Sequence, residues 1–148
     1  MTDAPEATTA VFIRLIVDDA AAAIDFYAAA FDATEILRIA EPGGKIVHAE
    51  IQIGNDIVSL AESDGELNRS PSQLGGSPVI VTVNTNDVDT MAERTVSNGG
   101  EAIFPVEDRE YGRRDGRYRD PEGHIWLIGQ DSEALSNEEI QGRLDPGS

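Results

Sequence analysis

The amino-acid sequence predicts an α+β fold built from two copies of a β-α-β-β-β unit, followed by a short C-terminal helix. Segments of β-branched or alternating apolar residues predict the strands, and two segments with an apolar stripe at helical spacing predict the helices. The two halves also align with one constant offset. Asp19 aligns with Asp87, and residues 57–60 align with residues 125–128 (87 − 19 = 68 and 125 − 57 = 68). One offset at separate places indicates an internal repeat.

The first unit begins with residues 11–17, an almost continuously apolar and β-branched run that predicts a buried strand. Asp19 offers an N-cap for a helix over residues 20–31. The core-facing stripe of this helix consists of Ile24, Tyr27 and Phe31. Further strands are expected at residues 34–40, 46–53 and 56–61.

Residues 62–77 contain Gly, Ser, Pro and Asn without a hydrophobic period, which predicts a linker. The second unit repeats the order of the first, with its helix at residues 88–97. Its strands are expected at residues 79–83, 101–106, 117–119 and 124–128. Residues 107–116 are predicted to form a loop. A capping-box pattern that starts at Ser136 predicts the last helix, over residues 136–144.

Length and composition favour one domain over residues 11–144, preceded by a flexible tail at residues 1–10. Within it, the two modules occupy residues 11–61 and 78–130. The chain has 148 residues, with 11 basic and 28 acidic side chains and a net charge of −17. A field of this sign repels phosphates, so we expect no nucleic-acid partner and no membrane partner. The absence of cysteine excludes disulfides and thiolate sites. The acidic N-terminus lacks a basic signal region, which favours a cytoplasmic protein.

Several short motifs recur in a characteristic order and spacing. They are Val17-Asp18-Asp19, Ile24-Asp25-Phe26-Tyr27, Asn86-Asp87-Val88-Asp89, Gly99-Gly100 and Asp120-Pro121-Glu122-Gly123-His124. Together they resemble the vicinal oxygen chelate superfamily, which comprises glyoxalases, bleomycin resistance proteins and dioxygenases. Further pieces resemble its PhnB-like branch: His48-Ala49-Glu50, Ile53-Gly54, Tyr111-Gly112 with Arg114 and Gly116, and Gly123-His124-Ile125-Trp126. Members differ widely in activity, so the resemblance concerns fold and family.

The resemblance implies a curved mixed sheet around a cup, with the helices outside, and a homodimer. In metal-dependent members the ligands come from the first and last strands of each module. The last-strand positions fall here on Ser59 and Leu127. The first-strand positions fall near Phe12 and Ile80, or on Arg14 and Thr82 if the register slips by two. These side chains cannot build the shell of a divalent cation. We therefore expect no metal ligands and no cofactor, with a displaced divalent metal as the disfavoured alternative.

His48 and Glu50 are the candidate catalytic pair. They stand at i and i+2 of one predicted strand, so their side chains share a face. One interpretation is a polar spot on the cup wall, where Glu50 orients His48 as a general base or as a hydrogen-bonding group for a ligand. The other interpretation is that this strand face is solvent-exposed, or forms a subunit contact, and has no catalytic or binding role.

The candidate ligand-binding residues lie mostly in the second half. Residues 109–119 hold five of the 11 basic side chains, interleaved with acids. Local ion pairing is one interpretation. The other is a mobile flap over the cup mouth, hinged at Gly112 and Gly116, in which Tyr111 stacks on a flat ligand and Arg114 or Arg117 pairs with its carboxylate or phosphate. Ser59 and Trp126 complete the candidates. Core packing is the other interpretation of Trp126, and for His124 we expect a structural role.

The leading functional hypothesis is a homodimeric protein of the bleomycin-resistance type that binds a small organic molecule in the cup without the usual metal site. The alternative is a lyase or isomerase that uses His48 and Glu50, or a displaced metal site. A third hypothesis is an interaction domain whose cup is filled by side chains.

Overall fold

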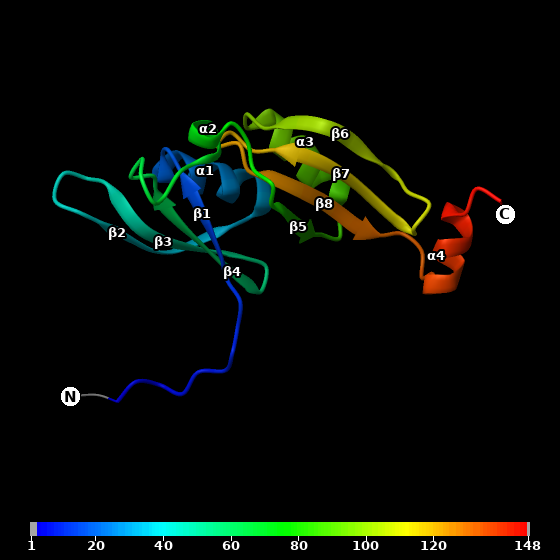
Figure 1. Ribbon diagram of the computed structural model, residues 1–148, viewed down its shortest axis with the longest axis horizontal. Coiled ribbons are helices and arrows are strands. Elements are labelled where there is room, and N and C mark those ends of the chain that lie inside the picture. Colours follow the sequence, from blue (N-terminus) through cyan, green and yellow to red (C-terminus); the bar gives the residue numbers. More distant parts are fainter. Residues whose placement is uncertain (1–2, 148) are drawn as a thin grey trace.

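The two halves of the chain form two four-stranded mixed sheets of identical topology (Figure 1). The computed structural model describes residues 3–147. The first half contains β1 (Ile13–Val17), α1 (Ala20–Phe31), β2 (Thr34–Ala40), β3 (Ile46–Ile53) and β4 (Asp56–Glu62). The second half contains β5 (Ile80–Asn84), α3 (Val88–Ser97), β6 (Glu101–Asp108), β7 (Arg113–Arg119) and β8 (Ile125–Asp131). The strand orders are β1-β4-β3-β2 and β5-β8-β7-β6, which confirms the predicted fold class and the repeat.

The repeat extends to the hydrogen-bond register. β1 pairs with β4 in parallel, with Arg14 opposite Ser59. β5 pairs with β8 in parallel, with Thr82 opposite Leu127. Both partners in the second sheet lie one repeat length after those in the first (82 − 14 = 68 and 127 − 59 = 68). A one-residue slip would turn every side chain to the other face, so a conserved register gives the two sheets equivalent faces.

Both long helices start at the predicted aspartates. The Asp19 side chain accepts a hydrogen bond from the Ala22 amide, and the Asp87 side chain accepts one from the Thr90 amide. These caps satisfy donors that the first turn of a helix leaves unpaired. α1 has the predicted bounds and buries its predicted stripe, with Tyr27 fully buried.

Two segments differ from the sequence-based expectation. The linker contains the short helix α2 (Pro71–Leu74), which Ser70 and Gln73 cap reciprocally. The predicted loop 107–116 is largely strand, because β6 continues to Asp108 and β7 begins at Arg113. Charged residues can occupy a strand where cross-strand ion pairs satisfy them. The last helix, α4 (Asn137–Leu144), begins with the predicted capping box.

The core lies between the helices and one face of each sheet. Trp126 of β8 is 2% exposed and packs against two residues of α1, with ring centroids 5.5 Å from Tyr27 and 4.8 Å from Phe31. α1 therefore covers residues of both halves, and it also packs against α3 (Figure 1). Burying such large rings contributes several kcal/mol.

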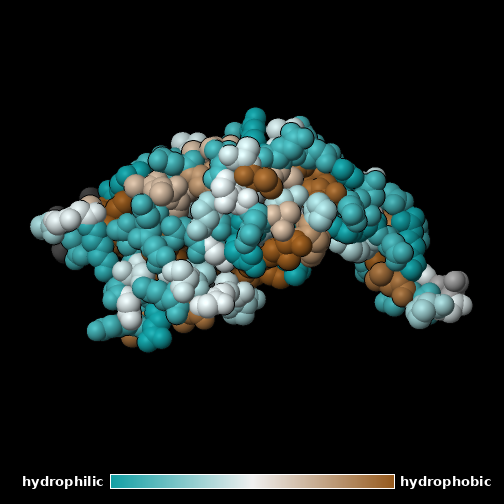
Figure 2. Space-filling view, turned by 90° about the horizontal axis from the view of Figure 1, so that it is seen from above, coloured by the Kyte–Doolittle hydropathy of each residue, from teal (hydrophilic) through white to brown (hydrophobic). Residues whose placement is uncertain are grey.

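The opposite face of each sheet is not covered by a helix, and we call these faces the first and second open faces. One row across the first consists of Arg14, Ser59, Glu50 and Leu37. The equivalent row across the second consists of Thr82, Leu127, Arg117 and Phe104. The molecule is bent into an arch, and its surface is mostly hydrophilic with small apolar patches (Figure 2). Within residues 3–147, no helix has both the length and the apolar character that a membrane span requires.

Candidate functional site

The first open face carries a hydrogen-bonded cluster of Arg14, His48 and Glu50. Arg14 comes from β1, whereas His48 and Glu50 alternate with the fully buried Ala49 and Ile51 on β3. The Nε2 atom of His48 lies 2.7 Å from Oε2 of Glu50. The Nη1 atom of Arg14 lies 2.8 Å from Nδ1 of His48. The structure thus brings the predicted pair together and adds an arginine.

Ser59 lies between Arg14 and Glu50 in the same row of this face. Its hydroxyl donates to the backbone oxygen of Ile13 at 3.4 Å, near the upper limit for a hydrogen bond. It is partly accessible on the open face, as its candidate role in ligand binding requires.

The positions that the resemblance assigns to metal ligands lie on the open faces but carry unsuitable side chains. The register pairs Ser59 and Leu127 with Arg14 and Thr82, the second of the two first-strand alternatives, whereas Phe12 precedes β1. These four side chains supply a cation, two hydroxyls and an alkyl group. A divalent cation prefers imidazole, carboxylate or thiolate ligands. Among residues 3–147, no three acidic or histidine side chains come together in a geometry that would hold an ion. The donor set of these four positions does not fit a divalent metal.

The second open face carries Arg117, whose environment differs from that of its neighbours. Its guanidinium carbon lies 5.1 Å from the centre of the Phe104 ring, a cation–π contact. Its Nε atom is buried and has no hydrogen-bond partner within the described chain. No carboxylate of residues 3–147 forms an ion pair with this side chain, whereas the other four arginines of residues 109–119 are all paired. Their partners include Asp115, Asp131, Asp89 and Glu101.

Beside Arg117, a second cluster is centred on Asp115, which is fully buried. Its carboxylate accepts hydrogen bonds from Arg109 Nε at 3.0 Å and from the Tyr111 hydroxyl at 2.7 Å. Burial, and then the bond to Asp115, raises the pKa of Tyr111. The Arg109 guanidinium also stacks on Phe104, with its carbon 5.0 Å from the ring centre. Tyr111 is thus held by its hydroxyl rather than free to swing.

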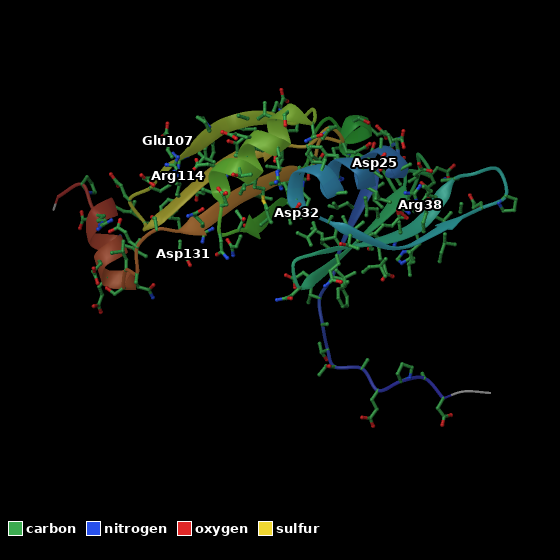
Figure 3. All side chains as sticks on the ribbon, turned by 180° about the vertical axis from the view of Figure 1, so that it is seen from behind. Asp25, Asp32, Arg38, Glu107, Arg114 and Asp131 are labelled. Atoms are coloured by element: carbon green, nitrogen blue, oxygen red, sulfur yellow. The ribbon has the colours of Figure 1, made fainter. Side chains whose placement is uncertain are left out.

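Arg114 lies on the other side of the second sheet from Arg117, because side chains alternate along β7. It pairs with Asp89 of α3 at 2.7 Å and with Asp108 at 3.4 Å. Figure 3 labels Arg114, in the half of the molecule that contains α3. These partners raise the pKa of Arg114. The hypothesis of a flap over a cup therefore needs correction at two points. Gly116 is no hinge but lies in the middle of β7, and Arg114 points away from the open face.

Trp126 and His124 lie at the junction of the two halves, not on an open face. The Trp126 indole donates to the Asp120 carboxylate at 2.8 Å, and the hydroxyl of Tyr27 donates to the same carboxylate. Burial raises the pKa of Tyr27, and the Asp120 charge raises it further. His124 bonds with Nε2 to the backbone oxygen of Ile16 at 2.8 Å. The structure thus places Trp126 in the core and gives His124 a structural contact.

Glu122 and Asp18 extend this junction. The Glu122 carboxylate accepts from the backbone amides of Asp18 at 2.6 Å and Asp19 at 3.3 Å, ahead of α1. Burial raises the pKa of Glu122. The Asp18 carboxylate accepts from the hydroxyls of Ser70 and Ser72, which lowers its pKa. This chain of contacts fixes the N-terminus of α2 to the residues before α1.

Sequence reasoning did not find two contributors to the open faces. It did not connect Arg14 with His48, because the two are 34 positions apart and only the sheet order brings them together. It did not single out Phe104, which stands between an isoleucine and a proline in a strand without a regular apolar alternation. The repeat offset does not locate Phe104 either, since its row counterpart Leu37 lies 67 rather than 68 positions before it (104 − 37 = 67).

Comparisons with known sequences agree with this architecture. Residues 9–128 match the family model described as Glyoxalase/Bleomycin resistance protein/Dioxygenase superfamily. The uncharacterized protein Mb0911c of Mycobacterium bovis is 38% identical over 135 residues, which are 88% of this chain and 89% of that protein. The uncharacterized protein Rv0887c of Mycobacterium tuberculosis is also 38% identical over 135 residues, which are 79% of its length.

Two solved structures illustrate the likeness of fold. TioX from Micromonospora sp. ML1 has a TM-score of 0.66 and 26% identity, over 84% of this chain and 99% of that one. The fosfomycin resistance protein FosX from Listeria monocytogenes, in complex with Mn(II) and sulfate, has a TM-score of 0.62 and 21% identity. That match covers 95% of this chain and 100% of FosX.

Proposed function

This chain belongs to the glyoxalase/bleomycin resistance protein/dioxygenase superfamily, and on that basis we propose that it binds a small organic anion on its open faces. The protein is of the bleomycin-resistance type and of the PhnB-like branch, and it holds its ligand without a metal ion. A flat ligand with a carboxylate or phosphate is the expected class.

The observation that carries this proposal is the state of Arg117. Its guanidinium is half-buried on the second open face, stacks on Phe104 and lacks a carboxylate partner within the described residues. The two Nη atoms of this guanidinium are not buried and have no hydrogen bond or ion pair within the described residues, so an anionic ligand could bind them through charge-assisted hydrogen bonds. The Phe104 ring beside it offers an apolar surface for the body of the ligand.

A second copy of the chain completes the cup in this proposal. Each chain leaves two sheet faces without a covering layer, and α4 buries none of its residues at the far end of the second half (Figure 1). Apolar side chains such as Phe12 and Ile80 are 63% and 42% exposed next to the rows described above. A homodimer that shares modules would cover these surfaces.

The test is a titration of ¹⁵N-labelled protein with 1-naphthoate, monitored through the amide chemical shifts in NMR spectra. Amides of β7 and β8 near Arg117 should shift, and Arg117→Gln should weaken binding about tenfold or more, since a hydrogen bond to a charged group contributes about 1.5–3 kcal/mol. Arg114→Gln is the matched control and should bind like the wild type. Equal affinities of wild type and Arg117→Gln would contradict the proposal.

Native mass spectrometry of freshly purified protein tests two further parts of the proposal, the absence of a metal ion and the dimer that completes the cup. The expected spectrum is a dimer without a stoichiometric divalent ion, with or without a bound organic anion. A stoichiometric metal would refute the metal-free part, and a monomer at micromolar concentration would refute the shared cup.

A second candidate function is a lyase or isomerase, and the Arg14–His48–Glu50 cluster favours it. Ordered chains of hydrogen bonds that position an imidazole are common among acid–base catalysts. A panel of small carbonyl compounds and epoxides is the test. Turnover that is lost in His48→Ala would support this activity, whereas a panel without turnover would refute it for these substrates.

A further inference from the structure

We propose that Arg14 is a positioning residue that holds His48 in one tautomer, so that Glu50 becomes the acceptor offered to a ligand by the first open face. The group that this site takes is a hydrogen-bond donor, N–H or O–H, on an apolar scaffold. The inference rests on the proposed function in one respect, that the ligand binds on the open faces.

The tautomer of His48 follows from the donor chemistry of Arg14. A guanidinium group has five N–H donors and no acceptor. The contact of 2.8 Å between Arg14 Nη1 and His48 Nδ1 is therefore a hydrogen bond only if Nδ1 carries a lone pair. The imidazole proton then resides on Nε2, which lies 2.7 Å from Glu50 Oε2 and donates to it.

The guanidinium is itself fixed by a second bond. Its Nη2 atom donates to the backbone oxygen of Val47 at 3.0 Å, next to His48 on β3. Two donors of one rigid planar group thus bind adjacent residues of one strand, which sets the orientation of Arg14. The position of the His48 ring is defined from both sides, by a donor at Nδ1 and by an acceptor at Nε2.

This arrangement assigns different roles to His48 and Glu50. Both ring nitrogens of His48 are occupied, and the lone pair that a general base needs is the one that faces Arg14. The lyase or isomerase alternative would therefore require Arg14 to release Nδ1. Glu50 uses Oε2 for His48, whereas Oε1 has no hydrogen-bond partner in the described part of the chain. The side chain is 31% exposed, so Oε1 is accessible. Within the Arg14–His48–Glu50 cluster, the acceptor available to a ligand is therefore the carboxylate.

The surroundings of Glu50 define the rest of the ligand class. Leu37 lies beside it in the same row, and Ile39, the partner of His48 in the register, is 52% exposed. An apolar body would lie on these side chains while its N–H or O–H reaches the carboxylate. A ligand without such a donor would leave the charge partly desolvated and unpaired, which is unfavourable.

The first test examines the tautomer without any ligand. Long-range ¹H–¹⁵N NMR spectra at pH 7.5 should show His48 with its proton on Nε2 and a hydrogen-bonded Nδ1. In Arg14→Met the Nδ1 resonance should move to the position of an unbonded acceptor nitrogen, and Arg14→Lys should partly restore it. A wild-type spectrum with the proton on Nδ1, or with averaged tautomers, would overturn the role of Arg14.

The second test compares the affinities of two neutral probes, 1-naphthylmethanol and 1-methylnaphthalene, measured from the NMR chemical shifts of the β3 amides. The wild type should bind the alcohol about tenfold more tightly, because only the alcohol donates to Glu50. Glu50→Leu should abolish this preference. The matched control Glu93→Leu, on the exposed side of α3, should keep it.

The outcomes separate this inference from the function on which it rests. Equal preference in wild type and Glu50→Leu, or binding of 1-naphthoate at Arg117 without any binding of the alcohol, would overturn the role of Glu50 alone. If neither the alcohol nor 1-naphthoate shifts residues of either open face, both the inference and the proposed function fail.

Discussion

The Nε2 atom of His124 and the backbone oxygen of Ile16 lie 2.8 Å apart, although 108 positions separate the two residues in the sequence. A carbonyl oxygen only accepts, so Nε2 carries a proton and donates it. The bond joins β1 of the first half to the turn before β8 in the second. It therefore contributes to the alignment of the two sheets.

Removal of this bond is expected to destabilise the junction moderately. His124→Ala should lower the free energy of unfolding by about 1–2 kcal/mol, since it leaves the Ile16 oxygen without its partner. Urea denaturation followed by tryptophan fluorescence measures the loss. A change below about 0.3 kcal/mol would show that water replaces the imidazole at no cost.

A larger effect is expected at Asp120, which is 3% exposed and accepts from the Trp126 indole, the Tyr27 hydroxyl and two backbone amides. Asp120→Ala should cost about 3–5 kcal/mol, because it leaves several buried donors unpaired. Tyr27→Phe removes one of those donors and should cost only about 1–2 kcal/mol. If the two variants have equal stability in urea, the carboxylate is not the centre of the junction.

The Asp18 carboxylate gives a prediction on pH dependence. Ser70 and Ser72 lower its pKa in the folded protein from the usual value of 3.8. The ionised group therefore adds stability that is present above about pH 3.8 and is lost as the pH falls through the lower folded pKa. In the double variant Ser70→Ala, Ser72→Ala, a ¹³C NMR titration should show the Asp18 pKa returning toward 3.8. An unchanged midpoint would contradict this cause.

Asp115 should control the titration of Tyr111. Burial and the bond to Asp115 both raise the Tyr111 pKa above 10.0. Asp115→Asn removes the negative charge, so the midpoint should fall toward 10.0 while the part due to burial remains. NMR of selectively labelled Tyr111 follows the titration. A midpoint that rises, or does not move, would refute the coupling.

Gly116 is expected to be intolerant of a side chain, because a Cβ there would lie 2.7 Å from the Val106 backbone nitrogen. Gly116→Ala should therefore destabilise the protein by about 1–3 kcal/mol. Gly142 of α4 is the contrasting position, since a Cβ there meets nothing within 4 Å. Gly142→Ala should be neutral or should stabilise α4 by up to about 1 kcal/mol. Thermal unfolding distinguishes the two, and tolerance at Gly116 would revive its role as a hinge.

Local sequence signals predicted most of the fold. The bounds of α1 were right because Asp19 caps it and its stripe is strongly apolar. β3 was right because His48 and Glu50 alternate with buried neighbours. Only the last three residues of β7 were predicted, because five charged residues in its seven positions have no hydrophobic period. Ion pairs with β8, α3 and β6 stabilise three of these charges in the strand.

The candidate sites were predictable only in part, because their contacts link distant segments. His48 and Glu50 are two positions apart, so their shared face follows from strand geometry alone. The contact of Arg14 with His48 depends on strand order, which no local pattern encodes. For Trp126, alternation left two directions open, and the position of α1 decided between them.

Glu50 and Arg117 occupy corresponding places in the two rows, each opposite the strand residue that the repeat relates, Ser59 and Leu127. The two units thus share the same backbone pairing but carry opposite charges at this position, a carboxylate in the first and a guanidinium in the second. A compound with two anionic ends would be attracted by Arg117 and repelled by Glu50. Under the proposed function, a ligand that reached both faces would bind in one orientation, with its anionic group at Arg117 and its hydroxyl group at Glu50.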